Sequence, residues 1–122
     1  MLIKRITCTV DKSQKEHFHK AQIDWGKLSA VPGFVCQIGG WKVDKAHIIA
    51  LWENKDAYRH FMDAIHDEIF HDSKQEKTYR SIEVSILDEE LNFSQAIRAL
   101  QEEGITIVHE WTVKGENQSI SL

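Results

Sequence analysis

The segment from residue 34 to residue 70 constrains the fold more than any other part of this chain. It reads as two apolar strand-like runs, residues 34–41 and 47–52, joined by a short polar stretch and followed by an amphipathic helix to about Phe70. So short a connection predicts an antiparallel hairpin. Apolar side chains recur in the helix at the spacing of one helical face: Tyr58, Phe61, Met62, Ile65 and Ile69. We therefore expect a hairpin that this helix covers.

The flanking segments supply further strands and helices. Three of them alternate apolar and polar side chains, as half-buried strands do: residues 2–10, 79–87 and 105–113. Helical spacing predicts a helix over residues 12–29 and another that starts at Asn92 or Ser94. The order β-α-β-β-α-β followed by α-β predicts an α+β fold, namely a ferredoxin-like split βαβ with an antiparallel sheet and a C-terminal helix–strand extension.

The length of 122 residues predicts one domain over residues 1–122. Its ferredoxin-like core covers residues 2–87, and the extension covers residues 92–114. The extension either lengthens the sheet within the chain or reaches across to a second copy. Because the second face of the sheet carries some apolar side chains, we expect it to pack against another sheet in a homodimer.

Several residues interrupt the regular patterns. Gly33 follows a proline and predicts a turn with positive φ, and Gly39-Gly40 predicts a bulge or a close backbone approach. Lys4 breaks the alternation of apolar residues in the first strand, and Gln14 and Gln22 lie on the apolar stripe of the first helix.

Composition excludes several classes of partner. The formal charge is −4 and basic residues form no run beyond pairs, so we expect no nucleic-acid partner. No apolar run approaches the ~20 residues of a membrane span, and the N-terminal stretch is too short and polar for a signal peptide. We expect a cytoplasmic protein with no membrane partner, in which Cys8 and Cys36 are buried thiols.

The run VPGF, the glycine-interrupted hairpin and the sequence LWENKDAYRHFMDAIH resemble the dimeric α+β barrel superfamily. Its relatives include the antibiotic biosynthesis monooxygenases and the haem-degrading monooxygenases. The resemblance covers about residues 2–87, and the whole chain is more similar to a small uncharacterised family from Bacillus-type bacteria. It implies a ferredoxin-like subunit in a dimeric α+β barrel.

The first functional hypothesis is a cofactor-independent monooxygenase that acts on a small aromatic molecule. His66 borders the apolar stripe of the second helix and is the candidate catalytic base or orienting group. The candidate pocket walls are Trp25, Trp52, Phe61 and Met62. This hypothesis requires neither a metal nor a cofactor.

Two alternatives stay open, and the sequence does not decide whether the chain is an enzyme. The first is a non-catalytic module that binds a small molecule or another protein. The weaker one is haem binding, because His71 falls at the spacing of the iron ligand in the haem-degrading branch. In that branch's pattern, however, the tryptophan position is Phe61 and the asparagine position lies near Thr7. Ionisable side chains converging in the cavity would favour chemistry over mere binding.

Overall fold

The computed structural model describes residues 1–73, 78–112 and 117–119, although not the side chains of residues 29, 68, 71–73 and 111 onward. In this part of the chain an antiparallel sheet has the strand order β4-β1-β3-β2-β5-β6. Its strands are β1 (Leu2–Thr9), β2 (Phe34–Lys42), β3 (Lys45–Trp52), β4 (Ser81–Asp88), β5 (Thr106–Thr112) and β6 (Asn117–Ser119). The order of the first four strands confirms the predicted ferredoxin-like plan.

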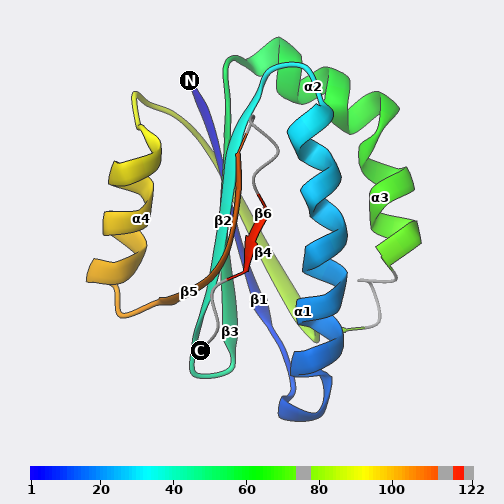
Figure 1. The fold of residues 1–122 in the computed structure, drawn as a ribbon, viewed down its shortest axis with the longest axis vertical. Coiled ribbons are helices and arrows are strands. Elements are labelled where there is room, and N and C mark those ends of the chain that lie inside the picture. The colour runs from blue at the N-terminus through cyan, green and yellow to red at the C-terminus, as the bar shows by residue number, and fades with distance from the viewer. Residues whose placement is uncertain (74–77, 113–116, 120–122) are drawn as a thin grey trace.

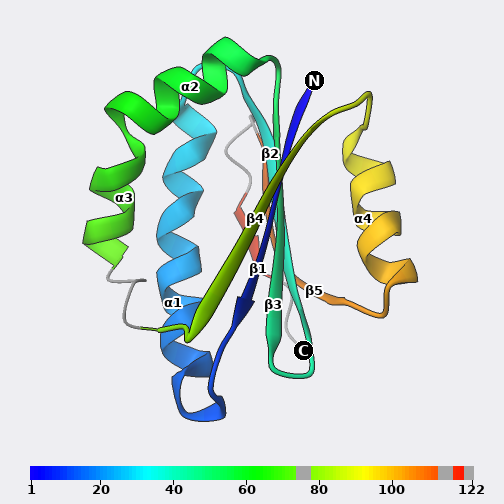
Figure 2. The same ribbon diagram turned by 180° about the vertical axis from the view of Figure 1, so that it is seen from behind.

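The helices lie on both faces of this sheet. They are α1 (Lys15–Asp24), α2 (Lys55–Ala64), α3 (His66–Ser73) and α4 (Phe93–Glu102), with 3₁₀ turns at Lys12–Gln14 and Trp25–Ala30. Figures 1 and 2 show α1, α2 and α3 on one face and α4 on the opposite face. The sheet is therefore the middle of three layers.

The prediction of one continuous helix from residue 54 to residue 70 is wrong. The chain leaves helical geometry at Ile65, whose φ is −129°, and α3 then runs in a different direction from α2 (Figure 1). The Asn54 side chain caps α2 by accepting a hydrogen bond from the Ala57 N–H at 2.8 Å, as one of the two predicted caps. Apolar spacing continues through Ile65, so periodicity alone does not reveal the break.

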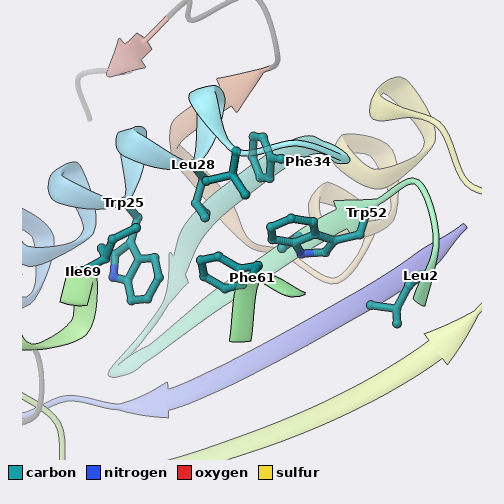
Figure 3. Packing of buried hydrophobic residues seen from close by; sticks show 9 residues of the cluster. Leu2, Trp25, Leu28, Phe34, Trp52, Phe61 and Ile69 are labelled. Atoms are coloured by element: carbon teal, nitrogen blue, oxygen red, sulfur yellow. The ribbon is translucent and has the colours of Figure 1, made fainter. Parts of the chain in front are cut away.

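A large apolar core lies between the sheet and the first helical layer. Figure 3 shows Phe61 of α2 between Trp25 and Trp52, below the turn that carries Leu28. These side chains are buried together with residues from β1, β2 and α3, namely Leu2, Phe34 and Ile69. This packing fixes the first helical layer over β1, β2 and β3.

The second face of the sheet is covered by α4 and not, as we predicted, by a second copy of the chain. We predicted that a second copy would cover it, but α4 of the same chain packs on it through the buried Ala96 and Leu100. A second core then forms against the sheet residues Ile3, Cys36, Ile38, Ile49 and Leu51. The extension also lengthens the sheet within the chain, because β5 pairs with β2.

The glycine pair in β2 behaves as predicted. The register against β5 shifts between Gly39 and Gly40. A Cβ on Gly39 would overlap the imidazole of the buried His109, and one on Gly40 would overlap the backbone carbonyl of Thr106. Gly33 adopts φ of 82°, as its turn requires. Within the described residues, no helix is both long enough and apolar enough to cross a membrane.

Candidate functional site

A cavity of about 310 Å³ lies between the sheet and the layer formed by α1, α2 and α3. Its floor comes from β1, β2, β3 and β4, and its roof comes from the helices and from the turn after α1. Ile82 and Val84 line it on β4 and are nevertheless 42% and 50% exposed. The cavity is therefore open toward the β4 edge, and its volume is at the lower end of that of small-molecule sites.

The four wall residues predicted from the sequence all line this cavity: Trp25, Trp52, Phe61 and Met62. Phe61 stacks on Trp52 with 4.8 Å between ring centres, and its ring meets that of Trp25 edge-on at 6.3 Å. Aromatic side chains from three separate elements thus build one apolar wall. Such a wall suits a flat, apolar ligand.

His66 is the first residue of α3, directly after the break at Ile65, and its ring lines the cavity. The ring centre lies 5.5 Å from Trp25 and 5.6 Å from Phe61. Burial, with a smaller contribution from Lys4, lowers the pKa of His66, while the neighbouring Asp67 opposes this shift. The imidazole is therefore neutral near pH 7 and able to accept a proton.

Asp67 orients the His66 ring. The distance from His66 Nδ1 to Asp67 Oδ1 is 3.1 Å. Because the carboxylate can only accept, a neutral His66 donates its Nδ1–H to Asp67 and keeps its lone pair on Nε2. The sequence does not reveal this role of Asp67, because the position of the His66 ring depends on the break between α2 and α3 at Ile65.

Lys4 of β1 brings a second ionisable group into the cavity, and its side chain is only 8% exposed. Its Nζ donates to Met62 Sδ at 3.8 Å and lies 5.2 Å from the centre of the Tyr58 ring. Burial lowers the pKa of Lys4 from 10.5 to about 8. The sequence signal for this residue is the break that Lys4 makes in the apolar alternation of the first strand, and the candidate site predicted from the sequence does not include it.

Gln22 of α1 adds an uncharged polar group. It is 3% exposed, and neither its side-chain oxygen nor its nitrogen has a hydrogen-bond partner in the described structure. Because an unsatisfied buried amide is costly, a ligand with a polar group gains affinity by bonding to it. Tyr58, whose pKa burial raises, supplies a further hydroxyl group.

The charged side chain that lines the cavity is cationic. Lys4 is the cationic side chain, and the described lining residues include neither aspartate nor glutamate. A carboxylate within reach would pair with a buried ammonium and hold its pKa up. A cavity with this lining favours a neutral ligand or one that carries a negative charge.

Other candidate residues lie elsewhere. The side chain of His71 lies outside the described part of the structure, although its backbone belongs to α3. Thr7 faces the opposite side of the sheet, where its Oγ1 lies 3.5 Å from His47 Nδ1. Cys8 and Cys36 are buried free thiols, as predicted, and burial raises the pKa of each to about 12. Among the described side chains no group of three His, Cys, Asp or Glu could hold a metal ion.

Comparison with known sequences identifies close relatives of this chain. Residues 2–87 match the model of a domain of unknown function (DUF4937). The chain is also 41% identical over 118 residues to uncharacterized protein YdbC of Bacillus subtilis (strain 168), across 93% of this chain and 98% of that protein.

Comparison with solved structures identifies the fold. The cofactor-independent oxygenase SnoaB of Streptomyces nogalater matches with a TM-score of 0.59 and 18% identity, over 75% of this chain and 95% of that one. A monooxygenase of Streptomyces coelicolor, solved with nanaomycin D, matches with a TM-score of 0.58 and 19% identity, over 75% and 89% of the chains. A protein of Deinococcus radiodurans, provisionally assigned as an antibiotic biosynthesis monooxygenase, matches with a TM-score of 0.62 and 12% identity, over 76% and 98%. The fold is that of the antibiotic biosynthesis monooxygenase-like proteins.

Proposed function

Because this chain belongs to the DUF4937 family, which carries no assigned activity, we propose its function from the chemistry of its cavity. The proposal is that the cavity binds a small phenolic aromatic molecule and oxygenates it without a cofactor. The observation that carries it is the convergence of two nitrogen groups, on Lys4 and His66, in a cavity that is otherwise lined mainly by aromatic and aliphatic side chains. The fold shared with a cofactor-independent oxygenase is an analogy that points to the same reaction class.

The two nitrogen groups divide the chemistry between them. His66 Nε2 takes the proton of the phenol, while the hydrogen bond to Asp67 holds the ring in place. The Lys4 ammonium then stabilises the phenolate, since an opposite charge within a few ångströms favours the ionised form. The aromatic wall formed by Trp25, Trp52 and Phe61 orients the ring of the substrate.

The reaction balances without any further reductant. Negative charge moves from the phenolate oxygen to a ring carbon, which forms a bond with one atom of O₂. His66 returns the phenol proton to the peroxide, and cleavage of the O–O bond with loss of the ring C–H proton then leaves a quinone carbonyl and hydroxide. The hydroxide takes up the ring proton to give water. The substrate gives up four electrons, one oxygen atom enters the quinone, and the other enters water.

Oxygen consumption with naphthol-type and quinol-type phenols tests the proposal. His66→Ala should lower the rate by about 10²- to 10⁴-fold, because general-base catalysis contributes that much. His60→Ala, on the exposed side of α2, is the matched control and should leave the rate unchanged. An oxygenation rate that is unaffected in His66→Ala would remove the role assigned to this residue.

A binding module is the second candidate, and it is favoured by the Gln22 amide, which has no hydrogen-bond partner in the described part of the chain. Such an amide serves ligand recognition equally well in a protein that performs no chemistry. Tight binding of a phenol without oxygen uptake would select this candidate. Haem binding has less support. The haem-degrading monooxygenases have an asparagine at a position that corresponds to about Thr7, and Thr7 lies on the face of the sheet away from the cavity.

The proposal includes a homodimer. α4 leaves the β4 part of the second face open, and Leu87, which pairs with Ile3 on that face, is exposed. Ile82, Val84 and Ile86 are exposed on the cavity side of the same edge strand. An edge strand that is apolar on both faces favours association with a second copy. Light scattering of the wild type and of Leu87→Lys measures whether a dimer forms and whether this strand holds it.

A further inference from the structure

Lys4 lies on a face of β1 that otherwise carries apolar side chains. Leu2, Ile6 and Cys8 precede and follow it on the same face, and its cross-strand neighbours are Ala50 and Ile86. Lysine is almost never so deeply buried without a charge partner. In the described structure, however, the Nζ contacts are a thioether and an aromatic ring, and no ion pair involves Lys4. Neither contact replaces the hydration that an ammonium group loses on burial.

The surroundings of the amine therefore favour its neutral form. The titratable groups that share its cavity are His66, Tyr58 and Tyr79, and the described lining includes no carboxylate that would hold the proton on Nζ. With a pKa of about 8, roughly a quarter of the Lys4 amine is neutral at pH 7.5. An ordinary lysine with a pKa of 10.5 has roughly a 250-fold smaller neutral fraction at that pH. Neutral lysine amines in apolar pockets are nucleophiles toward carbonyl groups.

We propose that Lys4 forms an imine with a small aromatic aldehyde or ketone bound in this cavity. The Nζ lone pair attacks the carbonyl carbon, and the resulting carbinolamine loses water to give the C=N bond. His66, as the neighbouring base, accepts and returns the protons that this exchange moves. No oxidant or reductant is required, because imine formation is a condensation.

The shape and polarity of the cavity define the class of carbonyl compound. The aromatic wall of Trp25, Trp52 and Phe61 selects a flat ring, and the volume of about 310 Å³ accommodates one or two fused rings. The Gln22 amide adds a hydrogen-bonding site for a hydroxyl substituent. The opening along β4, at Ile82 and Val84, gives such a molecule a path to the amine.

This activity goes beyond the proposed oxygenation, since it requires a carbonyl group and no oxygen. The two are separable by experiment: oxygenation fails when O₂ is absent, whereas imine formation proceeds under anaerobic conditions. Lys4 acts as an ammonium in the first and as a free amine in the second. Raising the pH from 7 to 9 therefore favours the imine.

The test is reductive trapping on the intact protein. The wild type is incubated anaerobically with 2-naphthaldehyde at pH 7.5, reduced with sodium cyanoborohydride, digested, and mapped by mass spectrometry. We expect the adduct at Lys4 to form at least 10-fold faster than at the exposed Lys20 and Lys45. The rate at Lys4 should rise with a midpoint near pH 8. This comparison between sites in one folded protein requires no variant.

Two variants and a competitor complete the design. Lys4→Met should abolish the fast adduct, and Lys45→Met should retain it. An excess of 2-naphthol should slow labelling at Lys4 but not at the exposed lysines, because both ligands occupy one cavity. Labelling spread evenly over the exposed lysines, with Lys4 no faster than they are, would overturn the proposal. So would a fast adduct at Lys4 that 2-naphthol does not slow.

Discussion

The Lys4 ammonium nitrogen lies 5.2 Å from the centre of the Tyr58 ring, with both groups lining the cavity under α2. A cation above an aromatic face is attracted by the ring quadrupole, which contributes about 0.5–2 kcal/mol. That contribution is smaller than the cost of burying an ammonium without a counter-ion. Lys4 is therefore a group that the fold accommodates at a cost in stability.

We predict that Lys4→Met raises the free energy of unfolding by about 3 kcal/mol at pH 7. The folded-state pKa of about 8 lies below the unfolded value of 10.5, so between these values the unfolded state binds more protons. Wild-type stability therefore rises with pH in this window, and the advantage of the variant shrinks toward pH 10. Urea unfolding at pH 7 and pH 10 measures the difference in the free energy of unfolding between the two proteins. The titration of Cys8 and Cys36 cancels in this difference, because both proteins contain these thiols.

The exposed Lys45→Met provides the control for this experiment and should show no such pH-dependent difference. An equal stability difference between wild type and Lys4→Met at both pH values would show that Lys4 has an ordinary pKa.

We predict that Gln22→Met raises the free energy of unfolding by about 1–2 kcal/mol, because it removes a buried amide that has no hydrogen-bond partner among the described residues. Methionine has a similar length and fills the same space. The variant should also bind hydroxylated aromatic ligands more weakly than the wild type. Calorimetric binding and urea unfolding measure the two effects, and Gln101→Met, on the exposed side of α4, is the control. A clear loss of stability in Gln22→Met would instead assign the amide a structural role.

We predict that the buried His109 makes the protein sensitive to acid. Burial lowers its pKa to about 4 from 6.5, so the unfolded state takes up the proton first as the pH falls. The stability that depends on a neutral His109 is fully present above pH 6.5 and is lost as the pH falls from 6.5 to 4. At pH 4 the loss in the free energy of unfolding is about 3 kcal/mol. His109→Phe should lose correspondingly less stability between pH 7 and 4.5 in urea unfolding. A parallel loss in both proteins would contradict this assignment.

We predict that α4 is an integral layer of the fold. Leu100→Ala should lower the free energy of unfolding by about 3 kcal/mol, because Leu100 is fully buried against the second face of the sheet. Glu103→Gln breaks the bidentate contact with Arg5, where both N···O distances are 2.9 Å, and should cost less than about 1 kcal/mol because the pair is partly exposed. Similar small losses in both variants would mean that α4 is loosely attached.

The sequence predicted the order of the elements well, because strand alternation and helical spacing are local properties. It predicted the positive φ of Gly33 and the close approach at Gly39-Gly40, because only glycine fits those backbones. It did not predict that α4 would cover the second face. An amphipathic stripe shows that a helix is buried but not which surface buries it.

The candidate site was predictable in part. The spacing of Phe61 and Met62 on one helical face placed them toward the sheet, and the structure brings Trp25 and Trp52 to the same cavity. Among the described residues Lys4 has no ion-pair partner, and this was not predictable because it depends on which distant residues approach the amine. The contact of His66 with Asp67 depends in turn on the break at Ile65, which apolar spacing does not reveal.

The ionisation of a bound phenol tests the central claim most directly, since the account requires the buried Lys4 to stabilise a phenolate in this cavity. The measurement is the difference absorbance of 2-naphthol at pH 7 on titration with wild type, Lys4→Met and Lys45→Met. We predict that the phenolate band appears with the wild type and with Lys45→Met and is absent with Lys4→Met. A phenolate band of equal strength with Lys4→Met, or binding of only the neutral phenol by the wild type, would contradict the account.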